Sequence, residues 1–347
     1  MGDSMLATHT ETAMADRLLD MIGASWMSQA ICVAAELNLP DLLAEQAQTA
    51  GQLAAATQCS QDALYRLLRG LASLGICIEQ EDGAFALTAM GALLRNDASG
   101  GVRSWAIWWG RHLWPKWHDL QSCIKTGKSA RELATGGKGY AHLEADAAAA
   151  QVFNRAMVEQ TRYVSREVLR EYDFSGARRV VDIGGGHGAL LTALLNAYPA
   201  MHGVIVDRAH AIDGAKAAIA TAGVAPRCEF TVGDFFESIP GGADIYLLKS
   251  ILHNWNDERA AVILGNCRHA MSGEARLLVI ERAMPARMQD TAREQAMART
   301  DLNMLVGLGG RERTEAQYHA LFAAAGLKLM RVITAGRELS IIEGAPA

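Results

Sequence analysis

The chain has 347 residues, of which 50% are hydrophobic, and a formal net charge of -5 with a pI near 6.1. This length is too great for one ordinary domain and suits two, and the apolar content is ample for two cores. The slightly acidic balance gives no general attraction to nucleic acid or to an anionic membrane, so we expect small molecules or further copies of the chain as partners. Residues 1–15 lack the basic start and apolar core of a secretory signal, and we therefore expect a cytoplasmic protein.

Six cysteines and ten histidines are scattered through the chain. The cysteines show no C-x-x-C spacing and the histidines no H-E-x-x-H pair. In a chain of this size the cysteines are consistent with reduced core thiols rather than a disulfide framework. The sequence predicts no metal site.

The N-terminal part predicts a mostly helical domain. We expect a disordered tail over residues 1–12 and a winged-helix domain over 13–98, which opens with an amphipathic helix from Ala13 to Asn38. Ser60 is a suitable N-cap for a helix that runs through Leu74. A hairpin with an Asp-Gly turn signal follows it.

A winged helix often binds DNA, so a regulator is the alternative to weigh. The helix that would enter the groove carries only Arg66 and Arg69, and the hairpin tip carries Glu79, Glu81 and Asp82. Acidic side chains at that tip would repel phosphates. Charge therefore disfavours a nucleic-acid partner.

A helical connector is expected over residues 99–172, and it begins with five tryptophans between Trp105 and Trp117. The spacing of Trp105, Trp108 and Trp109 places them on one helix face. Large aromatic side chains of this kind pack cores and interfaces, or they form one wall of a binding pocket. We expect one or two of them to contact a ligand.

The glycine-containing stretch 126–142 predicts a loop, and a helix from Glu144 to about Tyr172 completes the connector. Beyond it, residues 173–347 alternate between apolar strands and helices, and this alternation is typical of an α/β, doubly wound, mostly parallel Rossmann-like sheet. Two strands separated by Gly336 close the chain as an antiparallel pair. Ligands bind at the carboxyl ends of the strands in such a sheet.

A glycine loop follows the first strand of this sheet. The run from Val180 to Gly188 ends a buried strand, passes through three closely spaced glycines and opens a helix whose N-terminus faces the loop. Asp207 ends the next strand, where an acidic residue holds ribose hydroxyls. The spacing Gly184-x-Gly186-x-Gly188 differs from the G-x-G-x-x-G that fits a pyrophosphate, and Asp182 suits a cationic group. The pattern favours S-adenosylmethionine over NAD as the cofactor.

Several further motifs occur downstream of this loop: G-D-F-F at residues 233–236, L-H-N-W-N-D-E at 252–258 and G-G-R-E-R-T at 309–314. With the D-x-G-x-G-x-G loop, they make the chain resemble the class I, S-adenosylmethionine-dependent small-molecule O-methyltransferases, which include plant caffeate-type enzymes and bacterial enzymes that tailor natural products. The resemblance covers nearly the whole chain after the first dozen residues.

The resemblance implies a homodimer formed through the N-terminal domain, and a small-molecule acceptor. It implies that the cofactor contacts Asp182, Gly184, Gly186, Asp207, Asp234, Phe235 and Lys249. It implies an acceptor site lined by Trp105, Trp109, Phe153, Met157, Arg162, Asn254, Asn303 and Met304. A Phe and a Met four residues apart are equally typical of an ordinary helix core.

Methyl transfer to a phenol needs a base, because the pKa of a phenol is about 10 and the hydroxyl must lose its proton. His253 matches the base of the resembled family, and a carboxylate on its other ring nitrogen would fix the tautomer. Glu281 and Glu312 are the candidate carboxylates. The alternatives are a structural histidine packed on Trp255, and glutamates in exposed salt bridges with neighbouring arginines.

One residue departs from the family pattern, since Asn254 follows the histidine where an aspartate is usual. Asn keeps hydrogen bonding and removes the charge. Methylation of a hydroxyl on an aromatic or polyketide-like compound in secondary metabolism is the first hypothesis. N- or C-methylation of a heterocyclic natural product comes second, non-methylating use of the cofactor third, and a DNA-binding regulator fourth.

Overall fold

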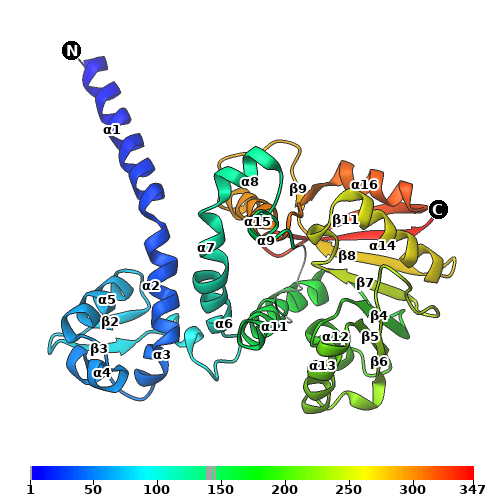
Figure 1. The fold of residues 1–347 in the computed structure, drawn as a ribbon, viewed down its shortest axis with the longest axis horizontal. Helices are drawn as coiled ribbons and strands as arrows, with labels where there is room; N and C mark the ends of the chain where they lie inside the picture. Colours follow the sequence, from blue (N-terminus) through cyan, green and yellow to red (C-terminus); the bar gives the residue numbers. More distant parts are fainter. Residues whose placement is uncertain (1, 138–142, 144–145) are drawn as a thin grey trace. The chain divides into compact units, whose positions relative to one another are not determined.

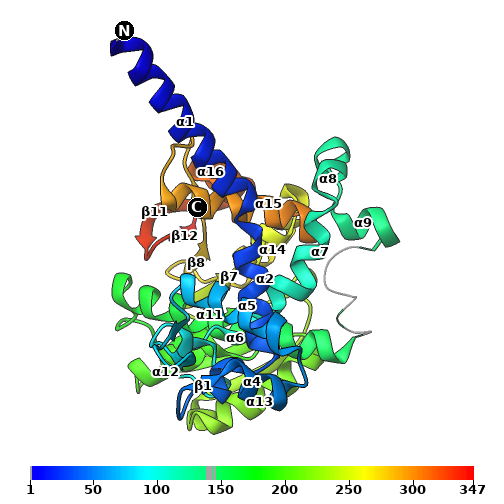
Figure 2. The same cartoon turned by 90° about the vertical axis from the view of Figure 1, so that its left-hand side faces the viewer.

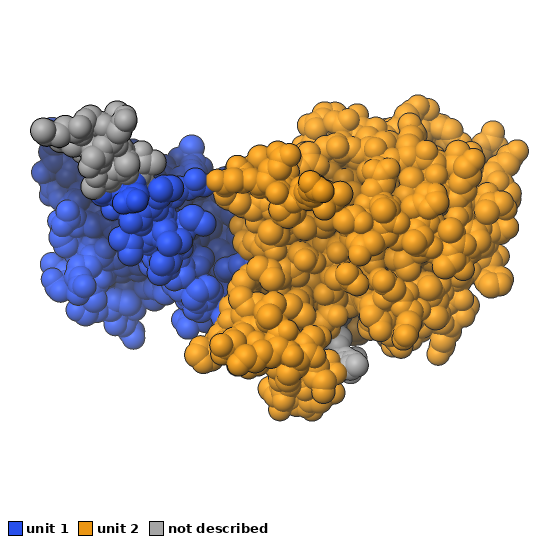
Figure 3. Space-filling model, turned by 90° about the horizontal axis from the view of Figure 1, so that it is seen from above, with its two compact units in different colours: residues 1–114 blue, residues 115–347 orange. Residues whose placement is uncertain are grey.

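The computed structural model describes residues 2–137, 143 and 146–347. The chain divides into two compact units, residues 1–114 and residues 115–347, which Figure 3 shows in different colours. This division falls later than the boundary after residue 98 that the sequence suggested. The first part of the expected connector over 99–172 therefore belongs to the N-terminal unit, and the rest to the C-terminal unit.

Unit 1 begins with two consecutive helices rather than a disordered tail and one helix. Helix α1 covers Gly2–Gly23, so the expected tail over 1–12 was wrong for residues 2–12, and α2 starts anew at Ser25 and ends at Glu36. Helix α1 extends beyond the remainder of unit 1 in both views (Figures 1 and 2). The other elements of the winged-helix part are α3(Leu39–Leu42), β1(Gln48–Thr49), α4(Ala50–Thr57), α5(Gln61–Ser73), β2(Cys77–Glu79), β3(Ala84–Leu87) and η1(Gly91–Leu94).

The winged-helix prediction is confirmed in its local signals. Thr49 and Gln52 form a reciprocal capping box at the start of α4. Ser60 is the N-cap residue of α5, although its side chain makes no capping hydrogen bond. The strands form an antiparallel sheet in the order β1-β3-β2, and Phe85 on β3 is fully buried in the core beneath the helices.

The tryptophan segment of unit 1 is not one regular α-helix. Helix α6 (Arg103–Ile107) widens into a π-helical turn, η2 (Trp108–Leu113), before α7 (Trp114–Trp117) begins at the boundary of the unit. The π-helical turn changes the spacing on which the prediction of a shared face for Trp105, Trp108 and Trp109 depended. The Trp105 and Trp109 rings lie 6.2 Å apart, while Trp108 stacks on His112 at 4.7 Å.

Unit 2 starts with short helices in a stretch where the sequence predicted a loop. The structure has α8 (Leu120–Thr126) and α9 (Ala130–Thr135), so the predicted loop over 126–142 was wrong for α9, and its last five residues lie outside the described residues. The long helix α11 covers Ala147–Glu171, with Asp146 accepting from the N–H of Ala149 as N-cap. Its expected start at Glu144 also lies outside the described residues.

The alternation of strands and helices in unit 2 gives the predicted sheet, with seven strands in the order β11-β12-β8-β7-β4-β5-β6 (Figure 1). Strands β4 to β8 run parallel, and β12 pairs antiparallel with both β8 and β11. Their bounds are β4(Arg179–Ile183), β5(His202–Asp207), β6(Cys228–Val232), β7(Ile245–Lys249), β8(Arg276–Glu281), β11(Leu327–Ala335) and β12(Leu339–Pro346). A short parallel pair, β9(Ala283–Met284) and β10(Arg313–Thr314), lies outside this sheet.

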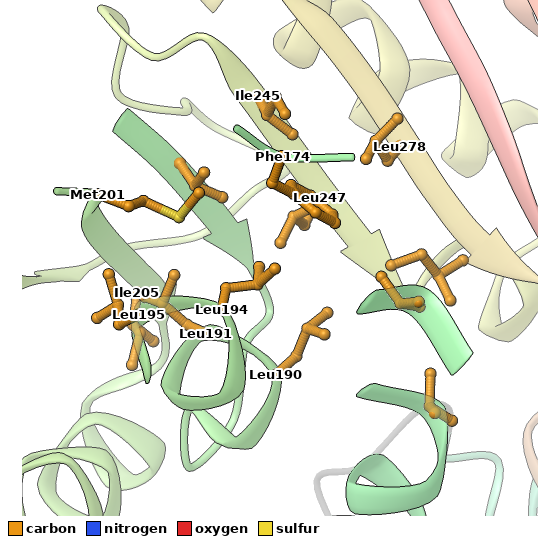
Figure 4. Close-up of a cluster of buried hydrophobic side chains, with 14 of the residues drawn as sticks. Phe174, Leu190, Leu191, Leu194, Leu195, Met201, Ile205, Ile245, Leu247 and Leu278 are labelled. Atoms are coloured by element: carbon orange, nitrogen blue, oxygen red, sulfur yellow. The ribbon is translucent and has the colours of Figure 1, made fainter. Parts of the chain in front are cut away.

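Helices cover both faces of the sheet, because successive side chains of each strand point to opposite faces. One face packs on α11, α12(Ala189–Ala197) and α13(Ala209–Thr221); Figure 4 shows Leu190, Leu191, Leu194 and Leu195 of α12 within this cluster. The other packs on α14(Asp257–Ala270) and α16(Glu315–Ala324). Helix α15(Ala292–Leu308) packs on α8 and α9. This arrangement is the doubly wound fold predicted from the sequence.

Candidate active site

The glycine loop lies where β4 ends, between two neighbouring parallel strands. The N–H of Gly184 donates to the carbonyl oxygen of Val206 on β5, and the N–H of Gly186 donates to Oδ2 of Asp207 at 2.8 Å. A Cβ added to Gly186 would meet no atom within 4 Å, so this part of the loop faces open space. The backbone can therefore come close to a ligand, as the sequence pattern required.

Two ionisable groups lie near this loop at the ends of β4 and β7: Asp182, which is buried, and Lys249, which is half-buried. Asp182 is 2% exposed, and its Oδ2 has no hydrogen-bond partner among the described residues. Burial raises the pKa of Asp182 to about 7, against the opposing charge of Lys249. Burial lowers the pKa of Lys249 to about 8, and its Nζ donates to Oγ1 of Thr161 on α11 at 3.0 Å.

These residues fit a cationic adenosine cofactor. The free oxygen of Asp182 is a buried acceptor that a positively charged or N–H-bearing group would satisfy, and an unsatisfied buried carboxylate is otherwise costly. Asp207 holds the loop with one oxygen, and its other oxygen accepts from the N–H of Arg208. This edge of the sheet provides the acidic groups expected around a sulfonium and a ribose.

The end of β6 adds an acidic and aromatic group to the same edge. Asp234 accepts from the N–H of Phe236 and forms an ion pair with Arg208 at 3.0 Å. The rings of Phe235 and Phe236 lie 4.9 Å apart, and each meets Trp255 edge to face. Phe235 thus stands beside the glycine loop as a flat apolar surface suited to a purine.

His253 lies in a short 3-10 turn, η4 (Leu252–Asn254), that follows β7. It is 7% exposed, and its Nδ1 lies 3.0 Å from Oε1 of Glu312. Burial by itself lowers the pKa of His253, but the charge and hydrogen bond of Glu312, with the charge of Glu281, raise it above its ordinary value. Burial likewise tends to raise the pKa of Glu312, and the imidazole and Arg282 together hold it below its usual range.

Glu281 has a different position from that of Glu312, although both were predicted as partners of the imidazole. Its Oε1 accepts from the backbone N–H groups of Ile251 and His253 at 2.9 and 3.1 Å. Its Oε2 accepts from the hydroxyl of Tyr318 on α16 at 2.6 Å. Glu281 is fully buried, and both of its oxygens are used in these bonds. It therefore holds the backbone of the turn rather than the imidazole ring.

Two later residues hold the other side of the His253 turn. The buried guanidinium of Arg313 donates to the carbonyl oxygens of Leu252 and Trp255 and to Asp257. Gly310 lies so close to the carbonyl of His253 that a Cβ there would overlap it. The turn is therefore fixed by side chains from β8, the 309–313 segment and α16.

The residues expected at the acceptor site are distributed over both units. Asn254 is buried next to His253 and donates from Nδ2 to the carbonyl of Ser250, which has a left-handed φ of 57°. Asn303 and Met304 are buried on α15, where Asn303 accepts from Nε1 of Trp117 at 3.3 Å.

The other expected acceptor residues lie on separate elements. Phe153 and Met157 are half-buried on α11, whereas Arg162 on the same helix is exposed. Trp105 and Trp109 belong to unit 1. Within unit 2, Asn254 follows His253 in the same 3-10 turn, and Asn303 on α15 contacts Trp117.

Sequence reasoning missed three side chains that the structure places in this network. Tyr318 directly follows a helix-capping box, which does not indicate a hydrogen bond to another element, and Thr161 is one small residue in a long helix, so neither gave a signal. Arg282 was considered only as an exposed partner of a glutamate, yet it is 6% exposed and lies 3.4 Å from Oε1 of Glu312. Only its position directly after Glu281 could have pointed to it.

The arrangement suits proton abstraction beside a bound electrophile. Glu312 fixes one ring nitrogen of His253 and leaves Nε2 to accept a proton. Among the described residues, no three His, Cys, Asp or Glu side chains gather in a way that could hold a metal ion.

Two sequence models of known protein domains match this chain. The sequence model of the O-methyltransferase domain matches residues 117–328, and that of the O-methyltransferase dimerisation domain matches residues 19–97. The phenazine O-methyltransferase PhzM of Lysobacter antibioticus is 38% identical over 330 residues, which cover 95% of each chain. The 8-amino-8-demethylriboflavin N,N-dimethyltransferase of Streptomyces davaonensis is 33% identical and covers 96% of each.

Solved structures agree with these relatives. The crystal structure of LaPhzM superposes with a TM-score of 0.91 at 37% identity, covering 96% of this chain and 99% of that one. The O-methyltransferase NcsB1 from neocarzinostatin biosynthesis, solved with S-adenosylmethionine and 2-hydroxy-5-methyl naphthoic acid, gives a TM-score of 0.77 at 31% identity, covering 92% and 96%. The chain belongs to this family of class I, S-adenosylmethionine-dependent methyltransferases.

Proposed function

We propose that the protein transfers a methyl group from S-adenosylmethionine to a hydroxyl of an aromatic or polyketide-like small molecule in secondary metabolism, with His253 as general base. The observation that carries this proposal is the buried pair of His253 Nδ1 and Glu312 Oε1 at 3.0 Å. A histidine whose pKa is raised by a carboxylate is a stronger base than free imidazole, and a phenol needs such a base.

In this proposal, different residues bind the cofactor and accept the proton. The bound cofactor supplies a methyl group on a sulfonium, which a nucleophile attacks in line. Asp182, Asp207 and the glycine loop would bind and orient it. His253 would take the hydroxyl proton on Nε2 while Glu312 stabilises the imidazolium, and Glu281 would hold the backbone of the turn in place.

The methyl group could be transferred to an oxygen or to a nitrogen, because the named relatives include both O- and N-methyltransferases. A neutral amine attacks with its own lone pair and loses its proton afterwards, so it depends less on a base than a phenol, whose hydroxyl must be deprotonated for attack. The buried side chains of Asn254 and Asn303 would offer hydrogen bonds to an acceptor's polar substituents. The base assembled around His253 favours a hydroxyl.

The test uses the purified protein, labelled S-adenosylmethionine and a panel of acceptors. The panel contains hydroxyphenazines, hydroxynaphthoates and an aminophenol such as 3-amino-4-hydroxybenzoate, which presents both nucleophiles on one ring. Label on oxygen would support the proposal. Label only on nitrogen would replace it with N-methylation. Binding of S-adenosylhomocysteine without transfer to any hydroxyl or amine acceptor would contradict methyl transfer to these classes.

We also propose that the protein is a homodimer through unit 1. Helix α1 exposes five large apolar side chains at 57–69%, namely Met14, Leu18, Leu19, Met21 and Ile22. The stretch Glu11–Glu36 is long and apolar enough to cross a membrane by length and composition, and 17% of its window is buried. A second copy of the dimerisation domain would cover this surface.

Light scattering and vesicle flotation together distinguish a second copy of the chain from a membrane as the partner of this apolar surface. A mass of two chains in detergent-free buffer, lost in a Leu18→Glu, Ile22→Glu double variant, would support the dimer. A monomer that floats with phosphatidylcholine vesicles would support a membrane instead and would contradict the proposal.

A further inference from the structure

The buried carboxylate of Glu312 is shared between two cationic groups. Its Oε1 lies 3.0 Å from Nδ1 of His253 and 3.4 Å from an Nη of Arg282. Arg282 is itself held from outside, because its Nε lies 3.2 Å from Oε2 of Glu338, whose side chain is 23% exposed. A chain of four charged or chargeable groups therefore leads from the solvent to the imidazole.

Arg282 opposes the groups that favour a charged imidazole. Glu312 and Glu281 both raise the pKa of His253, and the charge of Arg282 lowers it. Arg282 also lowers the pKa of Lys249 at the cofactor edge, so its charge acts on both parts of the site. An arginine stays protonated at every accessible pH, so this opposition is permanent.

The other charged or titratable groups around the His253 turn form hydrogen bonds with partners other than the imidazole ring. Arg313 binds backbone carbonyls of the turn and Asp257, Tyr318 donates to Glu281, and Asp301 accepts from the backbone N–H of Glu312. Glu281 faces the backbone N–H groups rather than the ring. Among the described residues, the cation in contact with the imidazole's own carboxylate is Arg282.

We propose that Arg282 is a positioning residue for methyl transfer: by sharing Oε1 of Glu312 with His253, it limits the hold of that carboxylate on a ring proton and so keeps the imidazole available as a base in neutral solution. This inference deepens the proposed function and rests on His253 acting as the base. Glu338 sets how strongly Arg282 pulls on Glu312, because the guanidinium is divided between the two carboxylates.

The sign of the effect follows from the charges. A base works only when it is unprotonated, so activity rises as pH rises through the pKa of His253. Removing the charge of Arg282 leaves Glu312 entirely to the imidazole, which raises that pKa and moves the acid limb of the activity profile to higher pH. Removing the charge of Glu338 leaves Arg282 entirely to Glu312, which has the opposite effect.

The direct test is an NMR titration of ring-labelled histidines in the full-length protein without acceptor. A His253→Asn spectrum identifies the His253 signal among the ten histidines. We expect Arg282→Met to raise the His253 midpoint by roughly one pH unit, and Glu338→Gln to lower it by less. Arg276→Met, which removes a more exposed arginine from the other end of the same strand, should leave it unchanged.

Glu338→Gln keeps the test decisive if Arg282→Met does not fold, because residue 338 is partly exposed. Equal midpoints in wild type and in whichever of these two variants folds would overturn the inference. A shift of the Glu338→Gln midpoint upward would overturn it as well.

Activity then separates this inference from the proposed function. With the acceptor that takes up label, Arg282→Met should move the acid limb of kcat/KM by the same amount as the NMR midpoint, with little change in the affinity for S-adenosylhomocysteine. Arg282→Lys, which keeps the charge, should return the acid limb most of the way to its wild-type position. NMR shifts in Arg282→Met with an unmoved activity profile would show that His253 is not the base, while its coupling to Arg282 stands. If the rate depends on His253 but Arg282→Met shifts neither the NMR midpoint nor the acid limb of kcat/KM, His253 remains the proposed base and the role of Arg282 is refuted.

Discussion

The glycine loop after β4 and the His253 turn after β7 lie at the same edge of one sheet, yet they are held in different ways. The glycine loop takes its shape from its own backbone, with Gly184, Gly186 and Gly188 all at positive φ. The His253 turn takes its shape from residues that are distant in sequence: Glu281, Glu312 and Arg313. A cofactor common to a family can be held by a local motif, whereas the proposed base is placed by tertiary contacts.

Replacing the proposed base, His253, should give the largest effect and should act on chemistry alone. His253→Ala removes the proton acceptor, and we expect turnover to fall by roughly 100-fold or more, because general base catalysis contributes at least that much. Affinity for S-adenosylhomocysteine, measured by calorimetry, should stay near that of the wild type, since the glycine loop is formed without this side chain.

His269→Ala is the matched control, because His269 is exposed on α14 and its Nδ1 donates to the carbonyl of Gly265 in its own helix. It should leave both quantities unchanged. Near-normal turnover in His253→Ala would rule out the base assignment.

Changing the glycine loop should act on folding and cofactor binding together. Gly188 has a φ of 75°, and a Cβ there would lie 2.5 Å from Cδ1 of Ile205 in the core. We expect Gly188→Ala to lower the free energy of unfolding by roughly 2–4 kcal/mol, from left-handed strain and overpacking together. Urea unfolding of the cofactor-free protein measures this.

Gly223→Ala separates the two causes, because Gly223 has a φ of 73° and a Cβ there would meet nothing within 4 Å. This variant should lose only the backbone part, about 1 kcal/mol. If both variants lost the same amount, the close approach of the loop to β5 would not be a source of its stability.

The fold of unit 2 could be predicted because its signals are local. The alternation of strands and helices after residue 173 and the closing antiparallel pair were both predicted, and the structure has both. The expectations for residues 2–12 and for the loop near Ala130 were wrong. In both places polar or small residues fit a loop as well as a helix, so composition alone could not decide.

The sequence motifs predicted which residues form the site, but not which of them contact one another. Local motifs and the family resemblance named His253, Glu281 and Glu312, but they could not say which glutamate contacts the ring. That depends on how β8 and the 309–313 segment pack, which brings Glu312 to Nδ1 and leaves Glu281 to the backbone. Tyr318 had no local signal, because its role comes from a hydrogen bond between α16 and β8.

A third change should weaken the cofactor site without altering the base. Asp207→Ala removes the carboxylate that accepts from Gly186 and that is expected to bind ribose hydroxyls. We expect affinity for S-adenosylmethionine to fall roughly tenfold or more, since hydrogen bonds to a charged group are worth about 1.5–3 kcal/mol. Turnover at saturating cofactor should remain within a few fold. Unchanged affinity in calorimetric titration would show that the adenosine site lies elsewhere.

The smallest expected effect tests whether the His253 turn depends on distant side chains. Tyr318→Phe keeps the buried ring and removes only the hydroxyl that donates to Glu281. Glu281 would keep its two backbone donors but lose one partner, so we expect turnover to fall about fivefold, the equivalent of one ordinary hydrogen bond of about 1 kcal/mol. Tyr246→Phe is the matched control, because Tyr246 is equally buried and its hydroxyl donates to the carbonyl of Ala270, away from the turn. Both variants should lose similar stability in urea, whereas only Tyr318→Phe should lose turnover; equal turnover in the two would mean that the hydroxyl of Tyr318 stabilises the fold without positioning His253.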